Sequence, residues 1–159
     1  MCKIVFCDVD GPLIPGRMYY AKNGHYSQEH GAFIYDPVAV GMLRELCKRC
    51  DAKIVYSTAH NEEDPNWMRR KARINGMEDL LHDDCRTEFR VSMYNKKDAI
   101  VEWLRRHPEV DKWIVFDDEH ILDGPPQVKV DFGIGLTIGN FFDAVELLTG
   151  KKKSELIIP

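Results

Sequence analysis

The chain has 159 residues, of which 44% are hydrophobic and 30% are charged, with a formal net charge of −4 at pH 7. This length suits one domain with its own core, and this composition excludes a wholly disordered chain. No apolar run approaches the roughly 20 residues of a membrane helix, and the negative net charge excludes a surface that attracts nucleic acid over its whole area. The five cysteines are scattered and odd in number, which favours free thiols in a reducing, cytoplasmic setting.

Three short apolar runs recur along the chain, and each starts with a lysine and ends in a carboxylate or hydroxyl side chain. They cover residues 3–8, 53–57 and 112–117. Continuous apolar runs of this length are typical of strands that are buried on both faces, as in a parallel sheet.

Helical patterns lie between these runs. Asp36 and Asp64 are N-cap residues, each followed by proline, which is favoured at the first helical position. The predicted helices cover residues 37–50, 65–75, 96–107 and 140–149. Strands that alternate with helices predict an α/β fold, an open and mainly parallel Rossmann-like sheet with helices on both faces. We expect a single domain over residues 1–150 with a short insert at 12–35, followed by a basic tail at 151–159.

Acidic residues end the first and the last apolar run. Asp8 and Asp10 are two residues apart, so they point to the same side of a strand, and Gly11 allows a sharp turn after them. Asp117 and Asp118 end the later run. Ligands bind at the carboxyl ends of parallel strands, so we expect these four carboxylates at one edge of the sheet. A cation must then offset their repulsion, and an oxygen-rich site of this kind suits Mg²⁺.

The motifs resemble those of the haloacid dehalogenase (HAD) superfamily of phosphohydrolases, and they come in the order of that family. Within it, the chain looks like the phosphatase domain of polynucleotide kinase–phosphatases and the small HAD domains of RNA-repair proteins. A response-regulator receiver has a similar inventory but a different motif order. The matching residues are Asp8-Val9-Asp10-Gly11, Ser57-Thr58, Lys97 at a helix start, and Asp117-Asp118.

The resemblance implies a catalytic role for each acidic residue. Asp8 would attack phosphorus and form an aspartyl-phosphate, and Asp10 would protonate the leaving oxygen and then activate water. The Asp8 side chain, the Asp10 backbone carbonyl and one or both of Asp117 and Asp118 would hold Mg²⁺. The resemblance also implies an open, minimally capped site.

A lysine at the start of the third predicted helix would offset charge on the phosphoryl oxygens. The sequence offers two neighbours, Lys96 and Lys97. We predict Lys97, because a basic residue directly before an acidic one at the helix start fits the family better, and we keep Lys96 as the alternative.

Other residues are predicted to bind substrate. Ser57, with Thr58 as a second candidate, would donate a hydrogen bond to the phosphate. His60 lies on the following loop, and Arg69 and Arg70 belong to a basic helix that either contacts a phosphate backbone or is simply solvated. The aromatic residues of the 12–35 insert either stack on bases or pack the insert onto the sheet.

Some conspicuous residues are predicted to be structural. Cys47 and Cys50 fall on the apolar stripe of the first helix, so we expect buried thiols rather than half of a zinc site. We expect Asp83 and Asp84 in a polar loop, and His82 and His107 in structural roles.

The predicted function is a Mg²⁺-dependent phosphatase that removes a terminal phosphate from a nucleic acid or a nucleotide. A 5′(3′)-nucleotidase or general small-molecule phosphomonoesterase is an alternative enzyme, and a non-catalytic phosphoacceptor or binding module is an alternative of another class. The expected partner is a phosphorylated nucleotide or nucleic-acid end, with no membrane and no obligate protein partner.

Overall fold

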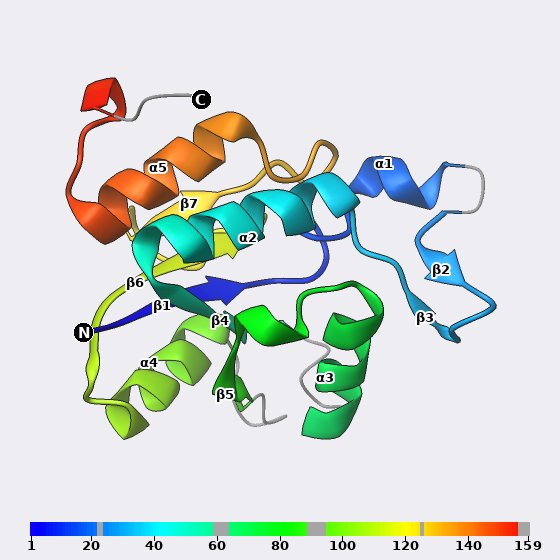
Figure 1. Cartoon of the computed structure of the whole chain (residues 1–159), viewed down its shortest axis with the longest axis horizontal. Helices are drawn as coiled ribbons and strands as arrows, with labels where there is room; N and C mark the ends of the chain where they lie inside the picture. Colours follow the sequence, from blue (N-terminus) through cyan, green and yellow to red (C-terminus); the bar gives the residue numbers. More distant parts are fainter. Residues whose placement is uncertain (22–23, 59–63, 89–94, 125, 156–159) are drawn as a thin grey trace.

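A single parallel sheet forms the centre of the protein. The computed structural model describes residues 1–21, 24–58, 64–88, 95–124 and 126–155. Its five-stranded sheet has the order β5-β4-β1-β6-β7, and every neighbouring pair is parallel (Figure 1). The strands are β1 (Cys2–Cys7), β4 (Ala52–Tyr56), β5 (Leu81–Arg86), β6 (Val110–Asp117) and β7 (Gln127–Lys129). The predicted α/β, Rossmann-like fold class is confirmed.

The three predicted strands are the central ones, and the two edge strands escaped prediction. Asp83 and Asp84 lie within β5, so the expectation of a polar loop there was wrong. An edge strand has one neighbour and one open side, and it tolerates charged side chains that a central strand excludes. β5 and the three-residue β7 therefore lack the continuous apolar run that marks the central strands.

Four longer helices connect and cover the strands. They are α2 (Pro37–Cys50), α3 (Pro65–Ile74), α4 (Lys96–Arg106) and α5 (Ile138–Thr149), with short 3₁₀ turns at Glu78–Leu80 and Lys153–Glu155. The predicted caps Asp36 and Asp64, and Asn95 at the start of α4, each accept a hydrogen bond from a backbone N–H of the first turn. No helix in the described ranges is both long and apolar enough to span a membrane.

Helix α5 starts two residues earlier than predicted. Thr137 is its N-cap, and its side chain accepts from the backbone of Asn140 while the Asn140 side chain accepts from the backbone of Thr137. This reciprocal capping box makes Asn140 the third helical residue rather than the first.

Helices cover both faces of the sheet. In Figure 1, α2 and α5 lie on one side of the strands and α4 lies on the other. Alternate residues of β1 serve the two cores: Val5 and Cys7 join the cluster under α2 and α5, and Ile4 and Phe6 join the cluster under α4. Trp103 of α4 meets Phe6 edge-on with ring centroids 5.4 Å apart, a geometry that adds about 0.5–1.5 kcal/mol beyond area burial.

The cysteine pair of α2 belongs to the core. Cys47 and Cys50 are both buried and free. Burial also raises the pKa of both thiols, which disfavours the thiolate that a metal site needs. The predicted buried positions are confirmed.

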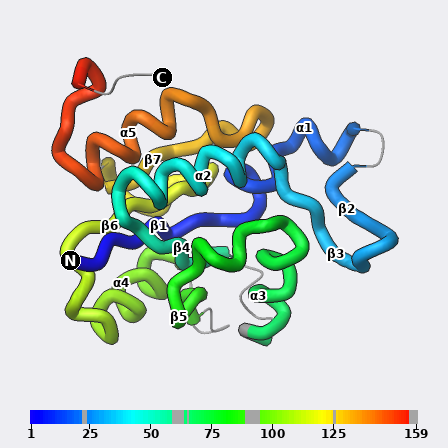
Figure 2. Tube along the Cα trace, viewed as in Figure 1, coloured from blue at the N-terminus to red at the C-terminus, as the bar shows by residue number. Residues whose placement is uncertain are grey.

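The insert at 12–35 lies beyond the carboxyl end of β1, as the tube in Figure 2 shows. It contains the short helix α1 (Gly16–Tyr19) and a small antiparallel hairpin of β2 (Tyr26–Ser27) and β3 (Ala32–Phe33). The insert therefore borders the edge of the sheet at which the acidic motifs are expected.

The capping box predicts the effect of Thr137→Ala. We expect the free energy of unfolding to fall by about 1 kcal/mol, because an N-cap hydroxyl that satisfies a helix N–H is worth about that much. Urea denaturation measures the change. Thr149→Ala is the matched control at the other end of α5, where the hydroxyl donates to the Val145 carbonyl, and we expect a smaller loss. Equal losses would contradict the cap assignment.

Candidate active site

The acidic motifs meet where neighbouring strands end. Asp8 directly follows β1, and its backbone N–H donates to the Phe116 carbonyl of β6 at 3.0 Å. On the other side of β1, the backbone N–H of Ser57 donates to the Cys7 carbonyl at 2.9 Å. The backbone ladder thus continues to the sheet edge and places Asp8 between Ser57 and Asp117.

Three carboxylates converge at this edge. Oxygen atoms of Asp8, Asp117 and Asp118 all lie within 4.8 Å of one another. Asp8 and Asp117 are buried, and buried hard oxygen donors are the ligands that Mg²⁺ prefers. The donor set therefore fits the predicted divalent cation.

Gly11 permits the close approach of the two acidic motifs. Its φ of +96° is in the region that favours glycine. A Cβ atom at this position would lie 2.9 Å from both Cβ and Oδ1 of Asp118. A side chain here would therefore push Asp118 away from the cluster.

The lysine at the start of α4 that joins the cluster is Lys96. Its Nζ lies 2.9 Å from Oδ2 of Asp8 and 2.8 Å from Oδ2 of Asp117. Lys97, the residue that we predicted, is exposed and lines the cleft beside the cluster. Adjacent helical residues point about 100° apart, so only one of the two can face both carboxylates, and here it is the first residue of α4.

Burial and mutual repulsion perturb the acidic groups. Burial, followed by the charge of Asp117, raises the pKa of Asp8 to about 7, although Lys96 acts in the opposite direction. Burial likewise raises the pKa of Asp117 against the effect of Lys96. For Lys96, burial lowers the pKa, but the two carboxylates raise it further, so the net shift is upward. The lysine therefore stays charged and serves as the counter-ion of the pair.

A cleft of about 580 Å³ opens over the cluster. Thr58 lines it and donates a hydrogen bond to Asp8, whereas Ser57 is not part of its lining. The Ser57 hydroxyl is buried and has no hydrogen-bond partner within the described part of the chain. The structure thus brings Thr58, our second candidate, to the cleft rather than Ser57. The described lining is Asp8, Asp10, Thr58, Asn95, Lys96, Lys97, Asp118, Glu119, His120, Ile121 and Phe132.

Asp10 faces the cleft from the start of the insert. Its Oδ1 accepts a hydrogen bond of 2.8 Å from the hydroxyl of Tyr19. Burial and this carboxylate raise the pKa of Tyr19 to about 12, so its hydroxyl is a donor at neutral pH. Tyr19 is one of the aromatic residues of the insert for which we predicted base stacking or packing. The contact with Asp10 was not predicted, because no motif marks a contact between a loop residue and Asp10.

The predicted basic residues of α3 have structural partners. Arg69 donates to the carbonyls of His82 and Asp83 and so attaches α3 to β5. Arg70 donates to the His30 carbonyl and lies 4.7 Å from the centroid of the Trp67 ring. Neither arginine is part of the described cleft lining. His60, the remaining predicted substrate contact, lies outside the described residues.

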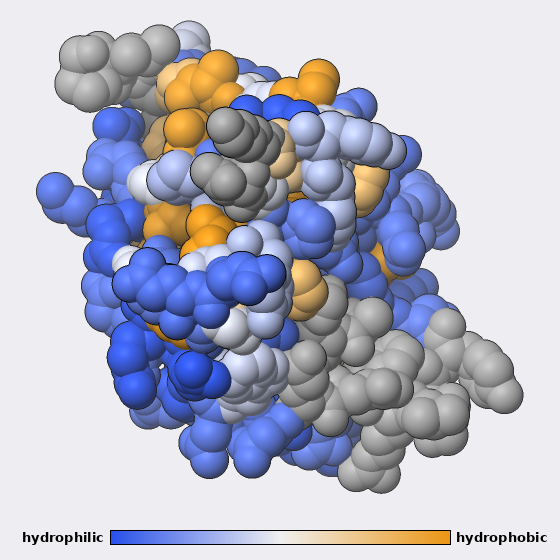
Figure 3. Space-filling view, turned by 90° about the vertical axis from the view of Figure 1, so that its right-hand side faces the viewer, coloured by the Kyte–Doolittle hydropathy of each residue, from blue (hydrophilic) through white to orange (hydrophobic). Residues whose placement is uncertain are grey.

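The side of the molecule that lies to the right in Figure 1 has a mainly hydrophilic surface. Figure 3 shows it face on, with small apolar groups between polar residues. Tyr19 and Phe132 are 41% and 47% exposed, so aromatic surface borders the acidic cleft.

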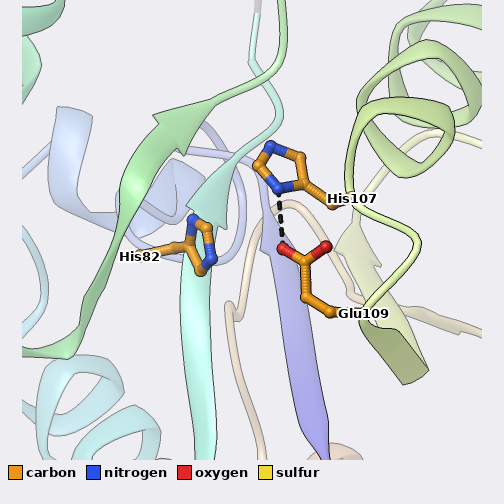
Figure 4. A group of neighbouring side chains, drawn as sticks. All are labelled: His82, His107 and Glu109. Atoms are coloured by element: carbon orange, nitrogen blue, oxygen red, sulfur yellow. Dashed lines mark hydrogen bonds and ion pairs between the residues drawn. The ribbon is translucent and has the colours of Figure 1, made fainter.

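A second group of metal-binding residue types lies at the opposite end of the sheet (Figure 4). His107 Nδ1 is 2.9 Å from Glu109 Oε1, and His107 Nε2 is 2.9 Å from Asp84 Oδ2. The His107 ring stacks on Trp103 with centroids 3.9 Å apart, and His82 approaches the same indole edge-on. Because both nitrogens of His107 have carboxylate partners, we interpret this group as a network that joins β5 to the end of α4. This agrees with the predicted structural roles of His82 and His107.

Comparison with known proteins gives one match. Residues 4–140 match the family model described as "HAD domain in Swiss Army Knife RNA repair proteins". No curated protein and no solved structure matches the chain. The match includes both acidic motifs, the lysine pair and the insert.

The raised pKa of Asp8 predicts a pH-dependent effect of Asp8→Asn on stability. The folded protein keeps the Asp8 proton up to about pH 7, whereas the unfolded chain releases it near the ordinary value of 3.8. Folded protein thus binds more protons in this window, and this group lowers stability as pH rises through it. We expect metal-free Asp8→Asn to match wild type near pH 4 and to exceed it by about 1–3 kcal/mol at pH 8, since one pKa unit corresponds to about 1.4 kcal/mol.

Urea denaturation at several pH values in the presence of a chelator measures this difference. Asp83→Asn is the control for the loss of one exposed carboxylate outside the cluster. An Asp8→Asn gain that is independent of pH would contradict the assigned electrostatics.

Proposed function

Because the chain belongs to the family of HAD domains in Swiss Army Knife RNA repair proteins, we propose that it is a Mg²⁺-dependent phosphatase that acts on a terminal phosphate of a nucleic acid or nucleotide. The observation that carries the proposal is the carboxylate cluster of the buried Asp8 and Asp117 with the half-buried Asp118, whose oxygen atoms lie within 4.8 Å of one another. A phosphoryl group has both a nucleophile and a cation site there.

Asp8 is the proposed nucleophile. A carboxylate oxygen of Asp8 attacks phosphorus, and the bond from phosphorus to the sugar oxygen breaks as Asp10 donates a proton to that oxygen. Water then gives its proton to Asp10 and attacks the aspartyl-phosphate. The bond between Asp8 and phosphorus breaks, inorganic phosphate leaves, and both carboxyl groups return to their starting states.

The remaining residues of the cleft bind and orient the phosphate. Asp8, Asp117 and Asp118, with the Asp10 carbonyl, would hold Mg²⁺, which when bound offsets negative charge on the phosphoryl oxygens. Lys96 supplies a positive charge next to Asp8 and Asp117. Thr58 is placed to donate a hydrogen bond to a phosphoryl oxygen.

Features around the cleft support a nucleotide or nucleic-acid substrate. The described part of the insert has only short elements, which favours a cleft open to a large substrate. Phe132 and Tyr19 present aromatic surface beside the acidic cluster, and a base stacked on such a ring gains about 1–3 kcal/mol. Arg70 and Trp67 form a cation–π pair on α3. This pair offers a further contact for a longer nucleic-acid substrate.

We also propose a reducing, cytoplasmic setting without an obligate protein partner. Its support is that all five cysteines are free, and free buried thiols are typical of such a compartment.

A substrate screen tests the proposed function. We expect release of inorganic phosphate from oligonucleotides with a 3′- or 5′-phosphate that requires Mg²⁺ and stops with a chelator. Asp8→Asn should lower kcat by about 10⁴-fold or more, the scale of loss when a nucleophile is removed, while the control Asp83→Asn keeps activity. A marked preference for mononucleotides or p-nitrophenyl phosphate would reject the polymer substrate. Absence of turnover by a folded protein would favour the non-catalytic module.

The lysine geometry gives a separate prediction. Lys96→Met removes the charge that contacts Asp8 and Asp117, and we expect kcat/KM to fall by about 10²–10³-fold, as for the loss of one electrostatic stabiliser. Lys97→Met is the matched control, one residue further along α4, and should cost less than about 10-fold on the same scale. Steady-state kinetics decide between them, and the reverse order would restore Lys97 as the catalytic lysine.

A further inference from the structure

A side chain of the 12–35 insert contacts Asp10. The hydroxyl of Tyr19 donates to Oδ1 of Asp10 at 2.8 Å. From this contact we infer that Tyr19 is a positioning residue, which holds the Asp10 carboxyl group in the orientation that proton transfer to the leaving oxygen requires. The inference rests on the proposed function and assigns to the insert a part in the chemistry.

Aromatic neighbours fix the ring of Tyr19. Its centroid lies 4.1 Å from that of His25 in the same insert. It also stacks on Phe132 at 6.3 Å with an interplanar angle of 27°. Phe132 lines the cleft. The phenol thus packs near two other rings, and its hydroxyl donates to Asp10.

The backbone of α1 is attached to the same loop that carries Phe132. The N–H of Gly16 donates to the Phe132 carbonyl at 2.6 Å, and the N–H of Arg17 donates to the Gly133 carbonyl at 3.2 Å. A Cβ atom on Gly16 would lie 2.7 Å from Cε1 of Phe132, so only glycine allows this approach. The Arg17 guanidinium forms an ion pair with Asp36, the cap of α2. These contacts place Tyr19 relative to the sheet edge.

The chemistry of a general acid explains why such support matters. The terminal torsion of an aspartate side chain is broad, so an unsupported carboxyl group samples many orientations. A donor on Oδ1 restricts that rotation. Positioned proton transfer contributes about 10²–10⁴-fold to a rate, and part of this depends on the orientation.

The test compares leaving groups. A sugar oxygen needs a proton as it leaves, whereas p-nitrophenolate is a stable anion that leaves without one. The measured quantity is the ratio of kcat/KM for a phosphorylated oligonucleotide to kcat/KM for p-nitrophenyl phosphate. Tyr19→Phe removes only the hydroxyl, and we expect it to lower this ratio by about 10-fold, which is a part of the general-acid contribution. Tyr20→Phe is the matched control: Tyr20 is 93% exposed, and its variant should keep the wild-type ratio.

A double-mutant cycle separates positioning from folding. Asp10→Asn should lower the same ratio by more than Tyr19→Phe does, and Tyr19→Phe should have no further effect in the Asp10→Asn background. Equal loss on both substrates, or an unchanged ratio in Tyr19→Phe, would overturn the positioning role while leaving the phosphatase in place. Wild-type protein that hydrolyses neither substrate with Mg²⁺ would overturn the proposed function itself.

Discussion

Repulsion between Asp8 and Asp117, and its compensation by Lys96, is the constraint on which the rest of the site depends. The two carboxylates end neighbouring strands and are almost completely buried, so their charges are costly there. The parallel sheet forces them together, because β1 and β6 pair along their whole shared length. The first residue of α4 supplies the counter-charge, and the N-cap Asn95 fixes where that helix begins. The pairing of the strands and the position at which α4 begins together determine the charge balance of the site.

The family match and the geometry complement each other. Membership in a HAD family of RNA repair proteins indicates what kind of chemistry the sheet edge serves, and the structure indicates which side chains are in reach of it. Thr58 and Lys96 contact Asp8 directly. The insert contacts Asp10 through the hydroxyl of Tyr19. The described lining of the cleft includes acidic groups and the aromatic ring of Phe132.

The sequence predicted the fold class, the central strands and the gathering of the acidic motifs, because continuous apolar runs and carboxylates at their ends are visible in one dimension. It did not predict β5, since a polar edge strand resembles a loop. Sequence alone also did not predict which of two adjacent residues contacts Asp8. The two members of each pair have similar chemistry, and they differ in the direction in which the side chain points. For Lys96 and Lys97 that direction depends on where α4 begins. For Ser57 and Thr58 it depends on where the pairing of β1 and β4 ends. The contact of Tyr19 with Asp10 depends on the path of the insert, which no periodicity encodes.

The ammonium group of Lys96, which bridges Asp8 and Asp117, has a consequence for the protein without a bound divalent ion. Because Lys96 already offsets charge of both carboxylates, the cluster stays assembled when no divalent ion is bound. A divalent ion that binds there would therefore add positive charge to a cluster that has already formed.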